Sequence, residues 1–322
     1  MTVERDLGFN TGLRVSYDGS HGSRLGSLIN INQVSKNTLG FAAASSQAPY
    51  PAIGYSQYET NGAISNYHAA TISLTKRMSN GLQFATSYVY ARNLSNEGGY
   101  NPSGFAGEYG GLVTDRFDPG HGLDYGNVAY TRRNRFLSTV VYDLPFGKGK
   151  TFGNSANRLS DALMGGWELA AVLLFQSGPF LTVTVPGADP SGTGFSTLIG
   201  NGRADIVAGA PLYSPNQSIS NWINNAAFAV PPNNLGRWPT SGVGILNGPG
   251  TRAVSLSMFK AVVVRENLRL RVGASAANLF NHPNYAAPNT TFNTPAFGTI
   301  SALQSAEGAG PRALQLGARL TF

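Results

Sequence analysis

The chain has 322 residues, with 40 glycines, 18 prolines and no cysteine, and only 12% of them are charged, about half of the share usual in soluble globular proteins. Aromatic residues make up 11% and the net charge is only +7, which argues against disorder and gives little support to nucleic-acid binding. The lack of cysteine excludes disulfides and thiolate metal sites, and the longest apolar run, Leu169–Phe175, is far shorter than the roughly 20 residues of a membrane-spanning helix.

Apolar and polar residues alternate with a period of two in many segments, which is typical of strands. In chain order the predicted strands are Thr2–Leu7, Leu13–Ser20, Tyr67–Arg77, Leu82–Arg92, Arg133–Leu144, Gly166–Gln176, Arg252–Val264, Leu268–Phe280 and Arg312–Phe322. The third and fourth are joined by Met78–Gly81, which ends in Asn-Gly, the strongest short hairpin signal. Only Ser160–Met164 is predicted as a helical turn. The sequence therefore predicts an all-β protein of about nine strands, most of them about ten residues long.

The connections between these strands alternate between short and long. The short ones are Gly8–Gly12, Met78–Gly81, Pro145–Gly165 and Arg265–Asn267, and the long ones are Gly22–Asn66, Asn93–Thr131, Ser177–Gly250 and Asn281–Pro311. Tight turns at one end and long loops at the other are the pattern of outer-membrane barrels, so we expect an antiparallel up-and-down transmembrane β-barrel. Because hydrocarbon offers no hydrogen-bond partners, such a sheet must close or be completed by neighbouring strands.

The last two predicted strands show two distinct faces. One face is apolar, and the other carries four polar side chains, which are predicted to line a water-filled lumen: Arg269, Arg271, Gln315 and Arg319. An arginine on the lipid face would cost about 2–4 kcal/mol at the middle of the bilayer. Aromatic residues near many strand ends fit a membrane-interface girdle, although aromatic residues also fill strand ends in other β-proteins.

Six groups of motifs follow one another along nearly the whole chain. They are Val15-Ser-Tyr-Asp-Gly-Ser-His-Gly22, Lys76-Arg-Met-Ser-Asn-Gly-Leu82, Tyr142-Asp-Leu-Pro-Phe-Gly-Lys-Gly149, Gly165-Gly-Trp167, Gln176-Ser-Gly-Pro179, and a C-terminal group of Ala277-Asn-Leu-Phe-Asn-His-Pro-Asn-Tyr285, Pro295-Ala-Phe-Gly298 and Pro311-Arg312. In this order they resemble the C-terminal barrel portion of Oar-type TonB-dependent outer-membrane receptors, which contain a carboxypeptidase-regulatory-like domain. No single motif is diagnostic, and the resemblance rests on all six in register.

The resemblance implies an outer-membrane transporter with an N-terminal β-sandwich, a plug and a barrel of 22 strands, energised through a TonB-type partner that binds an N-terminal segment. Residues 1–322 are expected to be the C-terminal part of the barrel, because they lack the sandwich, the plug, the partner-binding segment and a signal peptide. Met1 lies inside a predicted strand, which indicates a truncated chain. A partial barrel of this kind is expected to form a strongly curved sheet in chain order with two free edges.

The resemblance also implies an orientation and further partners. Phe322 is expected at the periplasmic end, where it would complete the signal read by the barrel-assembly machinery, so the short turns face the periplasm and the long loops are extracellular. Outer-membrane lipid and lipopolysaccharide would surround the barrel. The TonB-type energiser would reach it only through the missing N-terminal part.

The sequence shows no arrangement of residues suited to catalysis. The four histidines, His21, His68, His121 and His282, lie in different elements without metal-ligand spacing, so no metal site, cofactor or enzyme activity is predicted. Candidate ligand contacts are instead six aromatic residues of the long loops, which offer stacking surfaces: Tyr55, Tyr58, Tyr109, Tyr125, Trp222 and Trp238. Alternatively, these residues pack the long loops against each other.

The leading hypothesis is therefore an outer-membrane receptor barrel fragment whose intact parent takes up a large, unidentified solute by TonB-energised transport. An adhesin or a passive porin-like surface protein is the alternative. A soluble β-sandwich or carbohydrate-binding enzyme is a third possibility, and it predicts that a second sheet covers the apolar strand faces.

Overall fold

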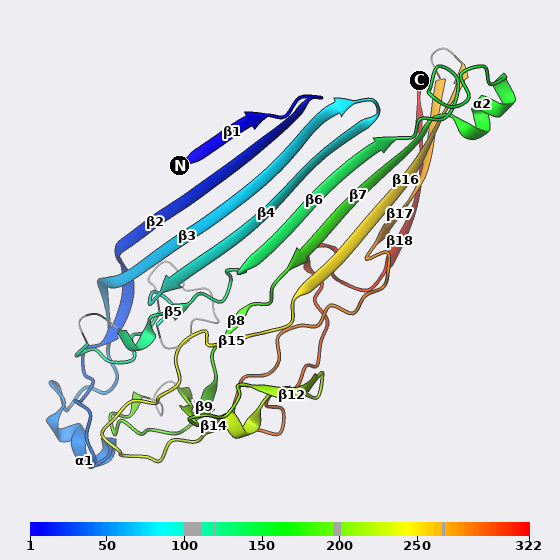
Figure 1. Ribbon diagram of the computed structural model, residues 1–322. Helices are drawn as coiled ribbons and strands as arrows, with labels where there is room; N and C mark the ends of the chain where they lie inside the picture. The colour runs from blue at the N-terminus through cyan, green and yellow to red at the C-terminus, as the bar shows by residue number, and fades with distance from the viewer. Residues whose placement is uncertain (100–110, 119, 121, 196–200, 266–267) are drawn as a thin grey trace.

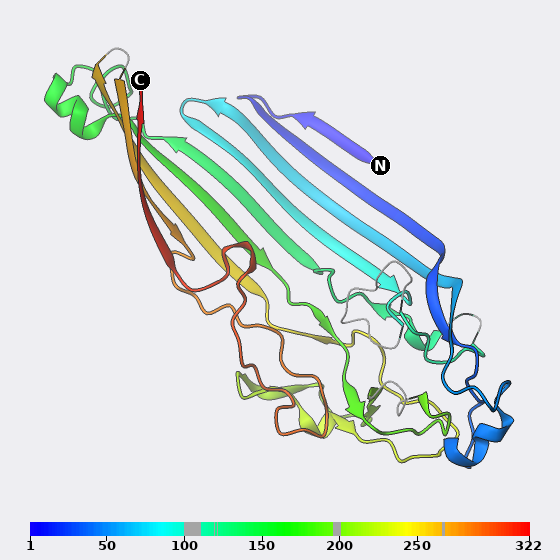
Figure 2. The ribbon, with the colours of Figure 1, turned by 180° about the vertical axis from the view of Figure 1, so that it is seen from behind.

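The computed structural model consists of one large antiparallel sheet with a layer of folded loops at one end (Figures 1 and 2). It describes residues 1–99, 111–118, 120, 122–195, 201–265 and 268–322. The main strands are β1 (Thr2–Asp6), β2 (Thr11–Asn30), β3 (Gln57–Ser79), β4 (Leu82–Ser95), β6 (Asn134–Asp143), β7 (Trp167–Gln176), β16 (Thr251–Arg265), β17 (Leu268–Ala277) and β18 (Ala313–Thr321). They pair in chain order, and the short β5 (Gly126–Asn127) pairs with the end of β4.

Within the described residues the sheet stays open, with β1 and β18 as its two edges. The sheet is also curved, because β17 and β18 are seen nearly edge-on where β2 to β4 are seen face-on (Figure 1). Every strand on the path is antiparallel to its neighbours, so β1 and β18, the first and last of nine, run in the same direction. The predicted fold class, a partial barrel of about nine antiparallel strands in chain order, is confirmed.

The second and third strands are much longer than the sequence predicted. We expected Leu13–Ser20 and Tyr67–Arg77, but β2 has 20 residues and β3 has 23, so the hairpin continues into the predicted loop Gly22–Asn66. The register of β2 against β3 shifts after Gly22 and again after Leu25. A bulge of this kind interrupts the alternation of side chains, and this is why the period of two could not be followed beyond the first part of each strand.

The two faces of the sheet differ in character, most clearly on β17 and β18. One cross-strand row on the first face runs through Val15, Ile72, Tyr88, Phe136 and Phe175. The side chain of Ile72 is 50% exposed, so no second sheet covers this face in the described part of the chain. We call this side the apolar face and the opposite side the inner face.

Aromatic side chains lie near both ends of the apolar face. Tyr88, Phe136 and Phe175 form the row near the loop end, with the Phe136 and Phe175 ring centroids 6.1 Å apart. Tyr142 and Trp167 lie toward the opposite end of β6 and β7. On β7 the two levels are separated by Leu169, Ala171 and Leu173, and on β6 by Ser138 and Val140. Aromatic levels with mostly aliphatic residues between them are typical of strands that cross a membrane between two interfaces.

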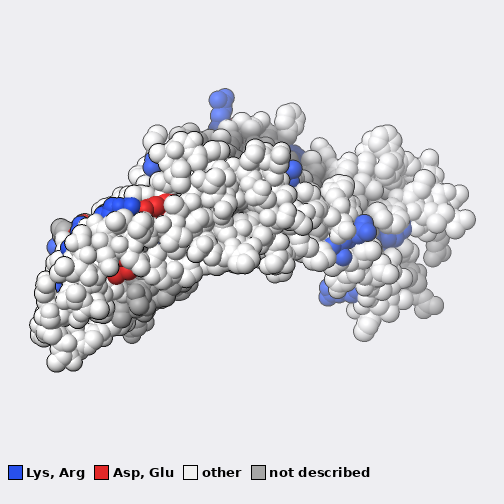
Figure 3. Space-filling model, turned by 90° about the horizontal axis from the view of Figure 1, so that it is seen from below, with Lys and Arg blue, Asp and Glu red and all other residues white. Residues whose placement is uncertain are grey.

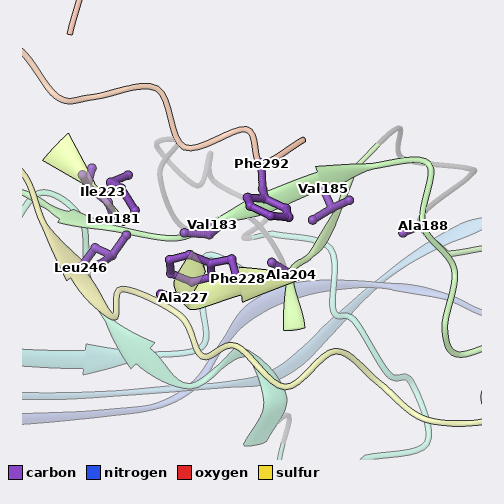
Figure 4. Close-up of a cluster of buried hydrophobic side chains, with 10 residues drawn as sticks. All are labelled: Leu181, Val183, Val185, Ala188, Ala204, Ile223, Ala227, Phe228, Leu246 and Phe292. Carbon is purple, nitrogen blue, oxygen red and sulfur yellow. The ribbon is translucent and has the colours of Figure 1, made fainter. Parts of the chain in front are cut away.

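Within the described residues the loop layer contains eight short strands. It also has a core of its own (Figure 4). Its strands are β8 (Phe180–Leu181), β9 (Thr184–Pro186), β10 (Asn201–Arg203), β11 (Asp205–Ile206), β12 (Tyr213–Ser218), β13 (Asn221–Ile223), β14 (Phe228–Ala229) and β15 (Leu246–Asn247), which form two-stranded sheets within the described residues. The core is formed by Leu181, Val183, Val185, Ala188, Ala204, Ile223, Ala227, Phe228, Leu246 and Phe292. Phe292 comes from the β17–β18 loop and all the others from the β7–β16 loop, so the two loops fold as one body.

Helical structure is sparse. The helices are α1 (Phe41–Ala44) and α2 (Arg158–Met164), with short 3₁₀ turns at Ser45–Gln47, Gly122–Asp124, Asn225–Ala227 and Ala306–Gly308. The helical turn predicted at Ser160–Met164 is confirmed as part of α2. None of the helices in the described ranges has the length and apolar character required to cross a membrane.

Candidate functional site

The structure brings the four predicted lumen residues onto the inner face. Arg271 of β17 lies directly opposite Arg319 of β18, Ser275 lies opposite Gln315, and Arg269 lies opposite Thr321. The intervening residues of both strands, such as Leu270 and Leu320, belong to the apolar face. The division of the two strands into faces is therefore as predicted, and the lining of a water-filled lumen by these residues stays a prediction.

A groove of about 360 Å³ lies on the inner face where three of these residues meet. Its lining residues are Phe259, Arg271, Gly273, Ser275, Gln315, Gly317, Ala318 and Arg319. The glycines create the space: a Cβ added to Gly273 would lie 2.3 Å from Phe259 Cδ1, whereas a Cβ added to Gly317 would have no atom within 4 Å. The Phe259 ring thus fills the space above Gly273, and the space above Gly317 is open.

The two groove arginines differ in their partners. Arg271 Nη2 donates to Glu168 Oε1 over 2.6 Å, and Arg271 Cζ lies 4.2 Å from the centroid of the Phe259 ring. No ion pair to Arg319 is found among the described residues. Like charges directly opposite on neighbouring strands repel each other. Because Glu168 compensates only Arg271, the groove keeps an uncompensated positive charge at Arg319, and it suits an anionic group.

The β17–β18 loop is tethered to the inner face near the loop end. Arg135, Gln176 and Thr251 form one cross-strand row on this face. Arg135 donates to both carboxylate oxygens of Glu307, Gln176 Nε2 donates to Glu307 over 3.4 Å, and Thr251 Oγ1 donates to Gln304 over 2.6 Å.

The hydrogen bond from Arg135 holds the pKa of Glu307 below its usual range. The loop therefore passes over the inner face and is fixed there by a charged contact. The sequence did not predict this contact, because a single glutamate between alanine and glycine in a long loop carries no periodic or motif signal.

The predicted loop aromatics lie in several separate places. Trp238 is 8% exposed, donates from Nε1 to Asp115 Oδ2 over 2.7 Å, and packs edge-on against Phe195. Trp222 packs against the loop-layer core and donates to Asn247 O over 3.2 Å. Both tryptophans thus contact other loop residues, and ligand binding by them stays a prediction.

The predicted tyrosines are also dispersed. Tyr125 OH accepts from Asn66 Nδ2 over 2.7 Å, whereas Tyr55 and Tyr58 lie at the far end of the β2–β3 hairpin and are 40% and 59% exposed. Tyr109 lies outside the described residues. The structure does not bring the five described aromatics into one site, and ligand binding by the exposed tyrosines stays a prediction.

Phe322 follows β18 at the end of the sheet opposite the loop layer (Figure 1), and 96% of its surface is exposed. Seen from the loop end, the surface consists mainly of uncharged residues, with lysine and arginine side chains in small separate groups (Figure 3). No cluster of three or more potential metal-ligating side chains is found in the described ranges.

An antiparallel sheet with an exposed apolar face, a polar inner face and long loops at one end defines the wall of a membrane β-barrel. A sequence profile described as "Outer membrane beta barrel domain" matches residues 1–315, and the chain belongs to this family. The family assigns the chain to the outer membrane. No curated protein sequence matches the chain.

Solved structures of outer-membrane proteins are also similar. P. aeruginosa FpvA bound to a heterologous pyoverdine and iron has 10% sequence identity and a TM-score of 0.41, and the match covers 97% of this chain and 25% of FpvA. The outer membrane transporter YddB from Escherichia coli has 9% identity and a TM-score of 0.42, and the match covers 99% of this chain and 31% of YddB. The chain thus spans between a quarter and a third of the length of these proteins.

Proposed function

We propose that the chain is the C-terminal barrel portion of a TonB-dependent receptor of the Oar type, and that the intact protein takes up a large anionic solute. The order of the six motif groups supports the Oar type. The proposal of an anionic solute rests on the groove at Arg319. This groove lies on the inner face of an outer-membrane sheet and keeps an uncompensated positive charge.

Uptake through such a barrel needs binding and release, and no bond is made or broken. The loop layer would make the first contact with the solute outside the cell. The tether between Glu307 and Arg135 would hold the β17–β18 loop over the inner face, so that the solute passes beside it. The groove would then bind an anionic group of the solute near the opposite end of the sheet, with Arg319 as the charged partner.

A passive or adhesive surface protein is the second candidate function. The observation that favours it is the loop layer, whose core includes six residues less than 2% exposed: Val183, Val185, Ala204, Ile223, Ala227 and Leu246. A loop surface built on a packed core of this kind suits binding to a large partner outside the cell without any transport step.

Two measurements on the full-length protein from outer membranes separate these functions. We expect cross-linking to the purified periplasmic domain of a TonB-type energiser and no steady conductance in planar bilayers, because a plug would close the barrel. Steady conductance without cross-linking would contradict energised transport and would support a passive pore. Absence of both, with retained binding of cells to surfaces, would support the adhesin.

A further inference from the structure

Helix α2 presents an apolar surface that nothing in the described structure covers. The helix lies in the connection between β6 and β7, at the end of the sheet opposite the loop layer (Figures 1 and 2). Leu159 and Leu163, one turn apart, are 74% and 68% exposed. Residues at this spacing share one side of a helix, and Asp161 lies on the other side, where its carboxylate accepts from the Lys148 backbone N–H over 2.5 Å. The helix is therefore amphipathic, with its apolar side free.

Two side chains of the apolar face hold the end of this helix. Trp167 Nε1 donates to the carbonyl of Leu163 over 3.0 Å, and Lys260 Nζ donates to the carbonyls of Leu163 and Gly165. Trp167 and Lys260 lie directly opposite each other on β7 and β16, next to the pair Leu169 and Met258. The ammonium group of Lys260 lies 5.3 Å from the Trp167 ring centroid. Helix α2 is thus attached to the apolar face.

The two anchoring residues are those expected at a membrane surface. Tryptophan concentrates at the level of the lipid headgroups, and a lysine on a lipid-facing position places its charge at the interface while its stem stays in apolar surroundings. Lys260 is 7% exposed and lies near the end of β16 that carries the short turn. Because the chain belongs to an outer-membrane barrel family, the apolar face meets lipid, and α2 continues that face at the level of the headgroups.

We propose that α2 lies in the plane of the outer membrane and inserts Leu159 and Leu163 into the leaflet at the short-turn end of the barrel. The apolar side of a short amphipathic helix is buried at the boundary between headgroups and acyl chains in this arrangement. The connection that carries α2 is then a lipid-binding element, rather than a free turn. The inference depends only on the membrane location of the sheet, and it holds whether or not the protein transports a solute.

The test uses single spin labels, because residues 1–322 contain no cysteine, and any cysteine elsewhere in the full-length protein is replaced by serine. Leu159→Cys and Leu163→Cys are labelled in the full-length protein in outer-membrane vesicles, and Ser155→Cys, an exposed position of the same connection, is the matched control. Oxygen is concentrated in lipid and a charged nickel chelate in water. We expect the ratio of oxygen to nickel accessibility to be several-fold higher at both leucine positions than at the control.

Equal ratios at all three positions would overturn the proposal, because the helix would then lie in water. Labels shielded from both oxygen and nickel would also overturn it, since they would show a protein partner instead of lipid. Folding of each variant is checked by its heat-modifiable migration in gels, a property of intact barrels that the exposed substitutions should preserve.

Discussion

Arg203 and Asp124 form a buried ion pair although they are 79 residues apart in the chain. Arg203 Nη1 donates to Asp124 Oδ1 over 3.0 Å, and the side chains are 4% and 0% exposed. The carboxylate of Asp124 also accepts from the backbone N–H and the hydroxyl of Thr114, at 2.8 and 2.5 Å. The pair joins the β4–β6 loop to the β7–β16 loop. Breaking it therefore tests whether these two loops are held together by this contact.

Replacing Arg203→Met should open this contact. Removing one partner of a buried ion pair leaves the other charge uncompensated and typically costs about 3–5 kcal/mol. We expect the backbone amide of Thr114 to exchange its hydrogen faster, while the amides of β7 and β16 keep their protection. Arg14→Met is the control, since Arg14 and its partner Glu4 are 59% and 69% exposed and such pairs contribute about 0–1 kcal/mol. Equal protection of Thr114 in both variants would contradict the prediction.

The loop layer should lose stability in acid through Asp205. Arg237 donates to both oxygens of this carboxylate, at 2.9 and 2.5 Å, and the hydrogen bonds from Arg237 lower the pKa of Asp205. A carboxyl with a lowered pKa in the folded state stabilises the fold above its usual pKa of about 4, and this contribution is lost as the pH falls through the lower value.

We therefore expect proteolysis of the β11–β14 region to accelerate between about pH 4 and more acidic values, measured with an acid-active protease. With a protease active at neutral pH, Asp205→Asn should be cleaved faster than the wild type, and with the acid-active protease it should lack this part of the acid response. A wild-type profile that is flat with pH, or an Asp205→Asn profile identical to it, would show that the contact with Arg237 does not stabilise the loop.

Glu307→Gln should release the β17–β18 loop from the inner face. The Arg135 and Glu307 side chains are 32% and 46% exposed, so the pair should contribute about 1 kcal/mol at most. The readout is local: hydrogen exchange at Ala309, whose N–H donates to Ala306 O, should accelerate several-fold. Glu4→Gln removes an exposed ion pair at the other side of the sheet and should leave Ala309 unchanged. If both variants behave alike, the tether is not what holds the loop.

Gly273 and Gly317 offer a paired test of the groove. Gly273→Ala would drive a methyl group into the Phe259 ring, and overpacking of this kind typically costs about 1–3 kcal/mol. Gly317→Ala meets no atom within 4 Å and should fold as well as the wild type. The measurement is the folded fraction at increasing urea concentration, read from heat-modifiable migration in gels. A Gly273→Ala variant as stable as Gly317→Ala would show that the Phe259 ring does not occupy this space.

Much of the sheet could be predicted because its strands obey a strict alternation. β18 is the clearest example, since the apolar residues from Leu314 to Leu320 fix which side of the strand Arg319 occupies. The same pattern failed beyond Gly22, because the bulges in β2 shift the side chains from one face to the other. The strand order could be predicted because short turns make consecutive strands pair. Pairing in chain order leaves the first and last strands as the two edges.

The loop contacts could not be predicted for a different reason. Arg135 with Glu307, and Arg203 with Asp124, join residues from separate long loops or from a loop and a strand, and nothing periodic relates their positions. Trp238 shows the same limit. A tryptophan in a long loop can stack on a ligand or pack in a core, and its contacts with Phe195 and Asp115 could not be read from the sequence.

The common direction of β1 and β18 restricts how this sheet can assemble. Consider two copies inserted with their loops on the same side of the membrane and their apolar faces both toward lipid. Their sheets could join only by placing β18 of one copy beside β1 of the other, and these two strands would be parallel. Pairing β1 with β1 would be antiparallel only if one copy were inverted, with its loop layer on the wrong side. An all-antiparallel closed barrel has an even number of strands, so a barrel that contains these nine strands needs an odd number of others. The odd number of strands in this sheet therefore disfavours pairing between the edges of two copies during assembly.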